Sequence, residues 1–154
     1  MGGSQTFDRL TRKALEEHRQ IHFYLDQITQ SLAGLKEDAT DVEPMRRLAA
    51  EIQSLEERLL EHHTDEESGG MFQAILEVLP ARRVEIDRLT NQHGKMIEIL
   101  EMARIHAQRG EVGEAESLRV DLEGFLEMFR RHEQAEERLL AQAIGEEQAT
   151  TEGS

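Results

Sequence analysis

The chain has 154 residues, with 32 acidic against 18 basic side chains and no cysteine, which gives a formal net charge of −14. The acidic balance argues against nucleic acid or an anionic membrane as a partner. The lack of cysteine excludes disulfides, thiolate metal sites and thiol catalysis. No apolar run approaches the ~20 residues that span a bilayer, and no signal-peptide pattern opens the sequence. We therefore expect a single cytoplasmic domain over residues 1–154.

Composition and periodicity favour an all-α protein. The sequence has only two prolines and one tyrosine, and it is rich in leucine, glutamate, arginine and alanine. Four segments repeat apolar residues at alternating steps of three and four, the pattern of one helix face. We predict helices at about 7–35, 44–67, 81–108 and 114–144. With short connections, these helices are expected to form an antiparallel up-down-up-down four-helix bundle over about 7–144.

Local signals place the ends of these helices. Thr40 or Asp41 can cap the second helix, and Pro44 suits its first turn. Ser68, Gly69 and Gly70 break it, after which residues 71–79 can form a short extra helical turn that Pro80 closes. Gly110 and Gly113 mark the last turn. The acidic tail at 145–154 is expected to be frayed and disordered.

Two similar stretches stand out on the second and fourth helices. Each contains a histidine followed four residues later by a glutamate, in the pairs His62/Glu66 and His132/Glu136. Positions i and i+4 lie on one helix face, so each pair can direct an imidazole and a carboxylate at one point. All four residues occupy the apolar stripe, where they are expected to be buried.

His18 and His93 occupy the same stripe on the first and third helices. At ~1.5 Å per residue, both lie ~18 Å above the base of the bundle, and His62 and His132, on helices running the other way, lie ~14 Å above it. The four histidines therefore fall at nearly one level. The chain also reads as two similar helical hairpins, each with one stripe histidine followed by one His-x-x-x-Glu pair.

Burying six such side chains without partners is costly, and a cation would remove that cost. Neutral imidazoles and ionised carboxylates are ligands of divalent and trivalent metals, and six donors suit two ions better than one. Glu66 and Glu136 could each bridge the two ions. Iron fits this donor set best, with manganese or zinc as alternatives. A metal-free network, in which each glutamate accepts a hydrogen bond from a histidine, is the competing interpretation.

Four nearby residues have less certain roles. His22, four residues after His18, is either a fifth histidine ligand or a residue that supports the ligands. His63 and Glu67 stand beside the core pair but point off the stripe, so we expect them at the surface or behind the ligands, and we expect His63→Ala to retain metal. Glu137 is interpreted in the same way.

The order His18, His62-x-x-x-Glu66, His93, His132-x-x-x-Glu136 resembles the hemerythrin-like (HHE cation-binding) domain family, over about residues 7–144. The resemblance implies a four-helix bundle around an oxo- or hydroxo-bridged non-haem di-iron centre, with those six residues as ligands. Oxygen-carrying hemerythrins have a second histidine on the third helix, where this chain has Ile97. They also have an aspartate at the position of Glu137. These departures argue against reversible oxygen transport and favour the subgroup linked to iron handling, sensing or repair of iron–sulfur centres.

Three functions follow from this sequence. The first is a di-iron protein that binds or senses a small diatomic ligand, oxygen or nitric oxide. The second is an enzyme or iron-handling protein that turns over peroxide or nitric oxide, or donates iron for iron–sulfur repair. The third is a metal-free or zinc-stabilised helical scaffold. No acid–base residue or substrate cleft is evident in the sequence, which favours the first.

Overall fold

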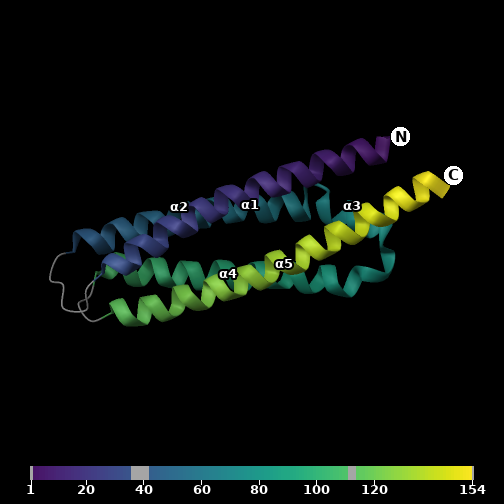
Figure 1. Ribbon diagram of the computed structural model, residues 1–154. Helices are drawn as coiled ribbons and strands as arrows, with labels where there is room; N and C mark the ends of the chain where they lie inside the picture. Colours follow the sequence, from purple (N-terminus) through teal and green to yellow (C-terminus); the bar gives the residue numbers. More distant parts are fainter. Residues whose placement is uncertain (1, 36–41, 111–113, 154) are drawn as a thin grey trace.

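The computed structural model describes residues 2–35, 42–110 and 114–153, and the side chains of 7–35, 42–110 and 114–150 (Figure 1). Four long helices pack antiparallel in a bundle, with one short helix at its end, which confirms the predicted all-α four-helix fold class. The elements in chain order are α1 (Gly2–Gly34), α2 (Glu43–Glu67), α3 (Met71–Val78), the 3-10 turn η1 (Pro80–Arg82), α4 (Arg83–Arg109) and α5 (Ala115–Gly153).

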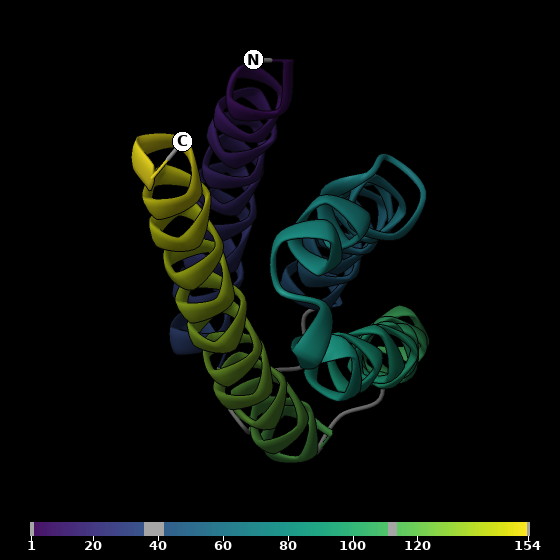
Figure 2. The same ribbon diagram turned by 90° about the vertical axis from the view of Figure 1, so that its right-hand side faces the viewer.

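The helices are arranged as two antiparallel pairs, α1 with α2 and α4 with α5, as the two views show (Figures 1 and 2). Helices α2 and α4 join the pairs by extensive packing, and α1 also contacts α5. The short helix α3 crosses the end of the bundle where both termini lie, and it packs against α1, α2 and α5. No helix in the described part of the chain is long and apolar enough to cross a membrane.

Most predicted helix boundaries agree with the structure, but the first helix begins earlier and the last helix ends later than predicted. The expected helical turn after the break is α3, and Pro44 lies in the first turn of α2. The proposed caps Thr40 and Asp41, and Gly113, lie outside the described residues. Helix α5 continues to Gly153 instead of fraying from residue 145. A single glycine inside a helix costs only about 1 kcal/mol relative to alanine, and the Glu, Gln and Ala residues around Gly145 favour helix.

Two glycines make the sharp turn between α2 and α3. Gly70 has φ 101°, a left-handed conformation that side chains rarely adopt. Gly69 lies so close to the last turn of α2 that a Cβ atom would come within 2.5 Å of the Asp65 carbonyl oxygen. This turn sends α3 across the end of the bundle instead of prolonging α2.

The apolar core consists of two clusters separated by a polar layer. One cluster fills the end of the bundle where α1 ends and α5 begins, and it includes Leu55, Leu100 and Phe125. The other, around Phe72 and Leu139, lies beneath α3. The buried histidines and glutamates come from the helix turns between these clusters. The polar layer is therefore closed at both ends by packed apolar side chains.

Candidate metal centre

Six polar side chains form the layer between the two apolar clusters. His18 comes from α1, His93 from α4, and the two His/Glu pairs come from α2 and α5, so all four long helices contribute. The buried donors, with their exposed fractions, are His18 4%, His62 2%, Glu66 1%, His93 4%, His132 3% and Glu136 1%. The predicted common level of the four histidines therefore matches the structure.

One group of donors lies on the α4 side of the layer. Nitrogen and oxygen atoms of Glu66, His93, His132 and Glu136 all lie within 4.8 Å of one another. His93 Nε2 is 3.3 Å from Glu66 Oε1, and His132 Nε2 is 2.7 Å from Glu136 Oε1. Four donors at such separations can surround one cation.

A second group lies on the α1 side and shares one carboxylate with the first. It contains His18, His62 and Glu136, with donor atoms again within 4.8 Å of one another. The Nε2 atoms of His18 and His62 are 3.1 Å apart, and His18 Nε2 is 3.9 Å from Glu136 Oε2. Glu66 Oε1 is also within 3.3 Å of His62 Nε2. Two groups with common carboxylates are suited to a pair of cations.

The Nδ1 atoms of the four histidines face a different set of residues. His93 Nδ1 is 3.0 Å from Glu67 Oε2, and His132 Nδ1 is 2.7 Å from Gln92 Oε1. His62 Nδ1 lies 3.4 Å from Glu17. His93 and His132 thus donate Nδ1–H to an oxygen, which leaves Nε2 free to bind a metal, whereas His62 Nδ1 makes no hydrogen bond.

The fourth histidine faces a carboxylate that the sequence analysis missed. His18 Nδ1 lies 3.6 Å from Glu133 Oε2 and 3.9 Å from Glu137. Glu133 lies next to His132 in the sequence, and neither the stripe nor the spacing of the His/Glu pairs singled it out. Glu17 and Gln92 were also missed, because each directly precedes one stripe histidine but faces the histidine of a different helix.

The two central glutamates strongly influence each other. Burial, together with the neighbouring Glu136 carboxylate, raises the pKa of Glu66 to about 12. Burial alone would also raise the pKa of Glu136, but its contacts with Glu66 and His132 outweigh burial and lower the pKa. Without a cation, the pair therefore keeps one proton and one charge. A metal ion between them would replace that proton and let both carboxylates ionise.

The donors fit a cation better than they fit a closed hydrogen-bond network. Among the described residues, both carboxylate oxygens of Glu66 and Nε2 of His93 and His132 are buried without a hydrogen bond. Buried polar atoms normally have hydrogen-bond partners, so several unpaired atoms in one layer indicate a site for a bound partner. Burial lowers the pKa of His18 and of His93. These imidazoles are thus neutral at physiological pH, as metal ligands must be.

His22 does not join either donor group in this structure. Its side chain is 50% exposed, and Nε2 lies 2.9 Å from both oxygens of Glu133. It therefore contacts a residue that faces His18 and does not contact the central donors. Of the two roles considered for His22, a ligand or a residue that supports the ligands, this position agrees with the second.

His63 is not at the surface, so of the two positions expected for it, the one behind the ligands is the one that the structure shows. It is 4% exposed and stacks on His93, with ring centroids 3.7 Å apart and an interplanar angle of 7°. A residue one place off the apolar stripe still faces an adjacent helix when that helix packs closely, as α4 does against α2. Glu67 and Glu137 are partly exposed and lie behind His93 and His18, as expected.

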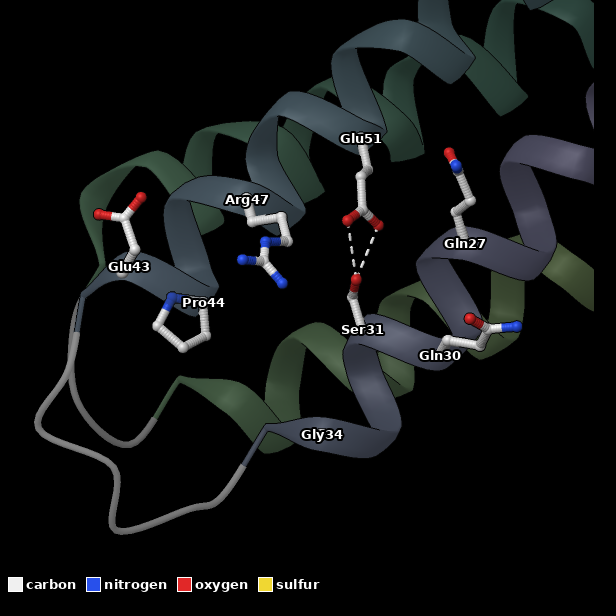
Figure 3. A pocket seen from close by; sticks show the side chains of 8 residues that line it. All are labelled: Gln27, Gln30, Ser31, Gly34, Glu43, Pro44, Arg47 and Glu51. Atoms are coloured by element: carbon white, nitrogen blue, oxygen red, sulfur yellow. Dashed lines mark hydrogen bonds between the residues drawn. The ribbon is translucent and has the colours of Figure 1, made fainter.

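Three surface hollows along the described helices are lined by residues other than the six donors. The one drawn in Figure 3 lies between the end of α1 and the start of α2, where Ser31 donates a hydrogen bond to Glu51. At ~1.5 Å per residue, Ser31 lies ~20 Å along α1 from His18. Another groove, between α4 and α5, has Gln92 in its wall. The donors themselves are enclosed by protein.

The fold and the site together define a helical bundle whose buried histidine and carboxylate side chains form groups suited to binding cations. The family model described as hemerythrin HHE cation binding domain matches residues 7–144. The chain belongs to this family, which confirms the resemblance inferred from the His and His-x-x-x-Glu pattern. Comparisons with curated proteins and with solved structures gave no match.

Proposed function

We propose that this protein binds two iron ions in the polar layer and uses them to bind oxygen or nitric oxide. The observation that carries the proposal is the pair of buried donor groups that share Glu136. Nitrogen-rich ligation with common carboxylates suits iron, with manganese or zinc as alternatives. In this assignment, Glu66 and Glu136 would lie between the two ions, and the histidines would bind the ions from their outer sides.

The surroundings of the donors favour a small uncharged ligand. Phe72 packs on the His93 ring at 5.8 Å between centroids, and buried Phe129, one turn before His132 on α5, belongs to the apolar cluster of Leu55 and Phe125. Such apolar walls exclude water and favour an uncharged gas over an ionic substrate. Two ferrous ions would supply the electrons that a diatomic ligand accepts on binding. The protein residues position the ions, hold the histidine tautomers and keep the layer dry.

Elemental analysis of protein purified under anaerobic conditions after expression with iron tests the metal assignment. We expect about two irons per chain. Oxygen or nitric oxide is then added to the ferrous protein, and new charge-transfer absorption is expected to develop. Protein that contains no metal and remains colourless would contradict the proposal. Equal thermal stability with and without metal would favour a plain scaffold, because specific binding must stabilise the fold.

One observation favours catalytic turnover as the second candidate. Half-exposed His22 contacts Glu133, and Glu133 lies 3.6 Å from His18 Nδ1, so a chain of titratable groups links the buried layer to solvent. Reduction of peroxide or nitric oxide consumes protons, which such a chain can deliver. Steady-state consumption that is lost in Glu66→Ala and slowed in His22→Ala would support an enzyme. Stoichiometric binding without turnover would support a carrier or sensor, and release of iron to an acceptor would support iron handling.

A further inference from the structure

A third group of possible metal donors lies between α1 and α5, on the outer side of His18. Donor atoms of His18, Glu133 and Glu137 all lie within 4.8 Å of one another. His18 Nδ1 is 3.6 Å from Glu133 Oε2 and 3.9 Å from Glu137 Oε1. His22 adds a further nitrogen, because its Nε2 lies 2.9 Å from both oxygens of Glu133. We call these four residues the outer cluster, which shares only His18 with the six central donors.

The outer cluster connects solvent with the polar layer. The side chains of His22 and Glu137 are about half exposed, whereas that of Glu133 is 12% exposed and that of His18 is 5%. The donors behind His18, such as Glu136 at 1%, are enclosed by protein. A cation that enters must exchange its water molecules for protein donors in steps, and an enclosed metal site needs such an entry path.

Two observations indicate a cation in the outer cluster. Nδ1 of His18 is buried without a hydrogen bond, although Glu133 and Glu137 both face it. Among the described residues, no lysine or arginine forms an ion pair with either carboxylate. Glu133 and Glu137 are four residues apart on α5, where like charges repel each other. A cation between them would remove this repulsion and give Nδ1 a partner.

His18 faces both the outer cluster and the polar layer, but it can bind only one ion at a time. Its Nε2 is 3.1 Å from His62 Nε2 and 3.9 Å from Glu136 Oε2, while Nδ1 faces the outer carboxylates. A neutral imidazole has a proton on one nitrogen and a lone pair on the other. When Nε2 binds an ion of the polar layer, Nδ1 carries the proton and no longer serves as a donor. Filling the layer therefore weakens the outer cluster, as a site for loading requires.

We propose that the outer cluster is a loading site, which takes a divalent transition-metal cation from solvent and passes it to the α1-side donors. The inference rests on the proposed pair of cations. Imidazole and carboxylate donors together suit ferrous, manganous and zinc ions. During transfer the ion leaves Nδ1 of His18 and binds Nε2 of the same ring, which releases its proton as Nδ1 takes one up. A metal-free ion pair between His22 and Glu133 is the competing explanation of the cluster.

Removing one charge at a time separates a loading site from such an ion pair. Glu133→Gln and Glu137→Gln keep the size of each side chain and an oxygen that accepts a hydrogen bond. Glu123→Gln is the matched control, because Glu123 is exposed on the same helix, ~15 Å from Glu133 at ~1.5 Å per residue. Chelator-treated protein is mixed with Co²⁺ under anaerobic conditions. Stopped-flow absorption measures the uptake rate, elemental analysis after gel filtration measures the final content, and circular dichroism establishes that each variant folds.

We expect wild type and Glu123→Gln to take up two Co²⁺ ions per chain at equal rates. Glu133→Gln and Glu137→Gln are expected to reach the same content about 10-fold more slowly, because the cation meets fewer charged donors on entry. An uptake rate equal to that of wild type in both variants would overturn the loading site and leave the cation pair intact. So would a lower content at an unchanged rate, since Glu133 and Glu137 would then only support His18. Wild type that retains no Co²⁺ would instead contradict the pair of cations on which both proposals rest.

Discussion

The Nε2 atoms of His18 and His62 lie 3.1 Å apart, although 44 residues separate the two histidines in sequence. Two neutral imidazoles can meet in this way only if one of the facing nitrogens carries a proton. Glu67 and Gln92, by contrast, hold the Nδ1 side of His93 and His132, which directs the Nε2 lone pairs of these two rings at the centre. One cation in each donor group would give both rings of that group a partner for Nε2.

Removing the histidine of either His/Glu pair is expected to abolish stable metal binding. His62→Ala and His132→Ala each take away a donor and leave its glutamate partner buried, so the affinity for at least one ion should fall by more than about 100-fold. Inductively coupled plasma analysis after gel filtration measures the metal that remains.

His22→Ala is the matched control, because His22 is exposed and lies outside both donor groups. It should retain the full metal content. If His62→Ala also retained two ions per chain, the central donor set would be wrong. The same measurement tests the expectation from sequence that His63→Ala retains metal, since His63 lies outside both donor groups.

The metal-free protein should lose stability as the pH rises above neutrality. Burial and Glu136 raise the pKa of Glu66 from 4.5 to about 12, so folded protein keeps a proton that the unfolded chain releases above pH 4.5. Folding then takes up a proton, and the stabilisation decreases as pH rises, by at most about 1.4 kcal/mol per pH unit. Urea denaturation in a chelating buffer at pH 7, 8 and 9 measures this slope.

The histidines give the opposite dependence at lower pH. Burial lowers the pKa of His18 and of His93 below 6.5, so the unfolded chain binds protons that the folded protein does not, and stability is lost as pH falls below 6.5. Metal-free protein should therefore be most stable near neutral pH. Glu66→Gln should remove the decline above pH 7. A wild-type stability that stays constant from pH 7 to 9 would show that Glu66 is ionised in the folded apo protein.

The residue that positions His132 can be tested separately from the ligands. Gln92 Oε1 lies 2.7 Å from His132 Nδ1 and fixes which nitrogen carries the proton. Gln92→Leu keeps the size of the side chain and removes the acceptor, so metal affinity is expected to fall by about 10- to 100-fold. Competition titration with a chelator measures it. Asn91→Ala, at the exposed neighbouring position, should leave the affinity unchanged, and equal affinities for both variants would contradict the positioning role.

The sequence predicted the central donors because their positions follow from helix periodicity alone. His18, His62, His93 and His132 occupy the same stripe as the core residues, and a stripe determines which side chains face the bundle axis. It does not determine how closely adjacent helices approach. For that reason the sequence left His63 either at the surface or behind the ligands, since its burial depends on α4 lying against α2.

Residues that face Nδ1 of the histidines could not be found from periodicity either. Glu17, Glu133 and Gln92 lie beside the stripe, and their contacts depend on the rotation of one helix relative to the next. The end of α5 was missed for a different reason. Glycine and acidic residues suggested fraying, whereas a helix that is already formed extends at little cost through residues with good helix propensity.

A pair of adjacent leucines tests the register of α2. Leu59 is completely buried in the core, whereas Leu60 is 48% exposed. Leu59→Ala leaves a cavity and is expected to lower the free energy of unfolding by about 2–5 kcal/mol, while Leu60→Ala should change it by less than about 1 kcal/mol. Chemical denaturation of metal-free protein measures both. Equal effects would mean that α2 is rotated relative to the structure, which would also displace His62 and Glu66 from the centre.

Two glycines should respond to the same substitution with opposite signs. Gly70 has φ 101° in the turn between α2 and α3, so Gly70→Ala forces a side chain into a left-handed conformation and should destabilise the protein by roughly 1–2 kcal/mol. Gly124 lies inside α5, where an added Cβ would meet nothing within 4 Å. Gly124→Ala should therefore stabilise by about 0.5–1 kcal/mol. Thermal unfolding of both variants measures the difference. Gly70 precedes α3, and α3 carries Phe72, which packs on the His93 ring. Gly70→Ala should therefore also weaken metal binding, whereas Gly124→Ala should not. Stabilisation by Gly70→Ala would contradict the turn geometry that closes this end of the metal layer.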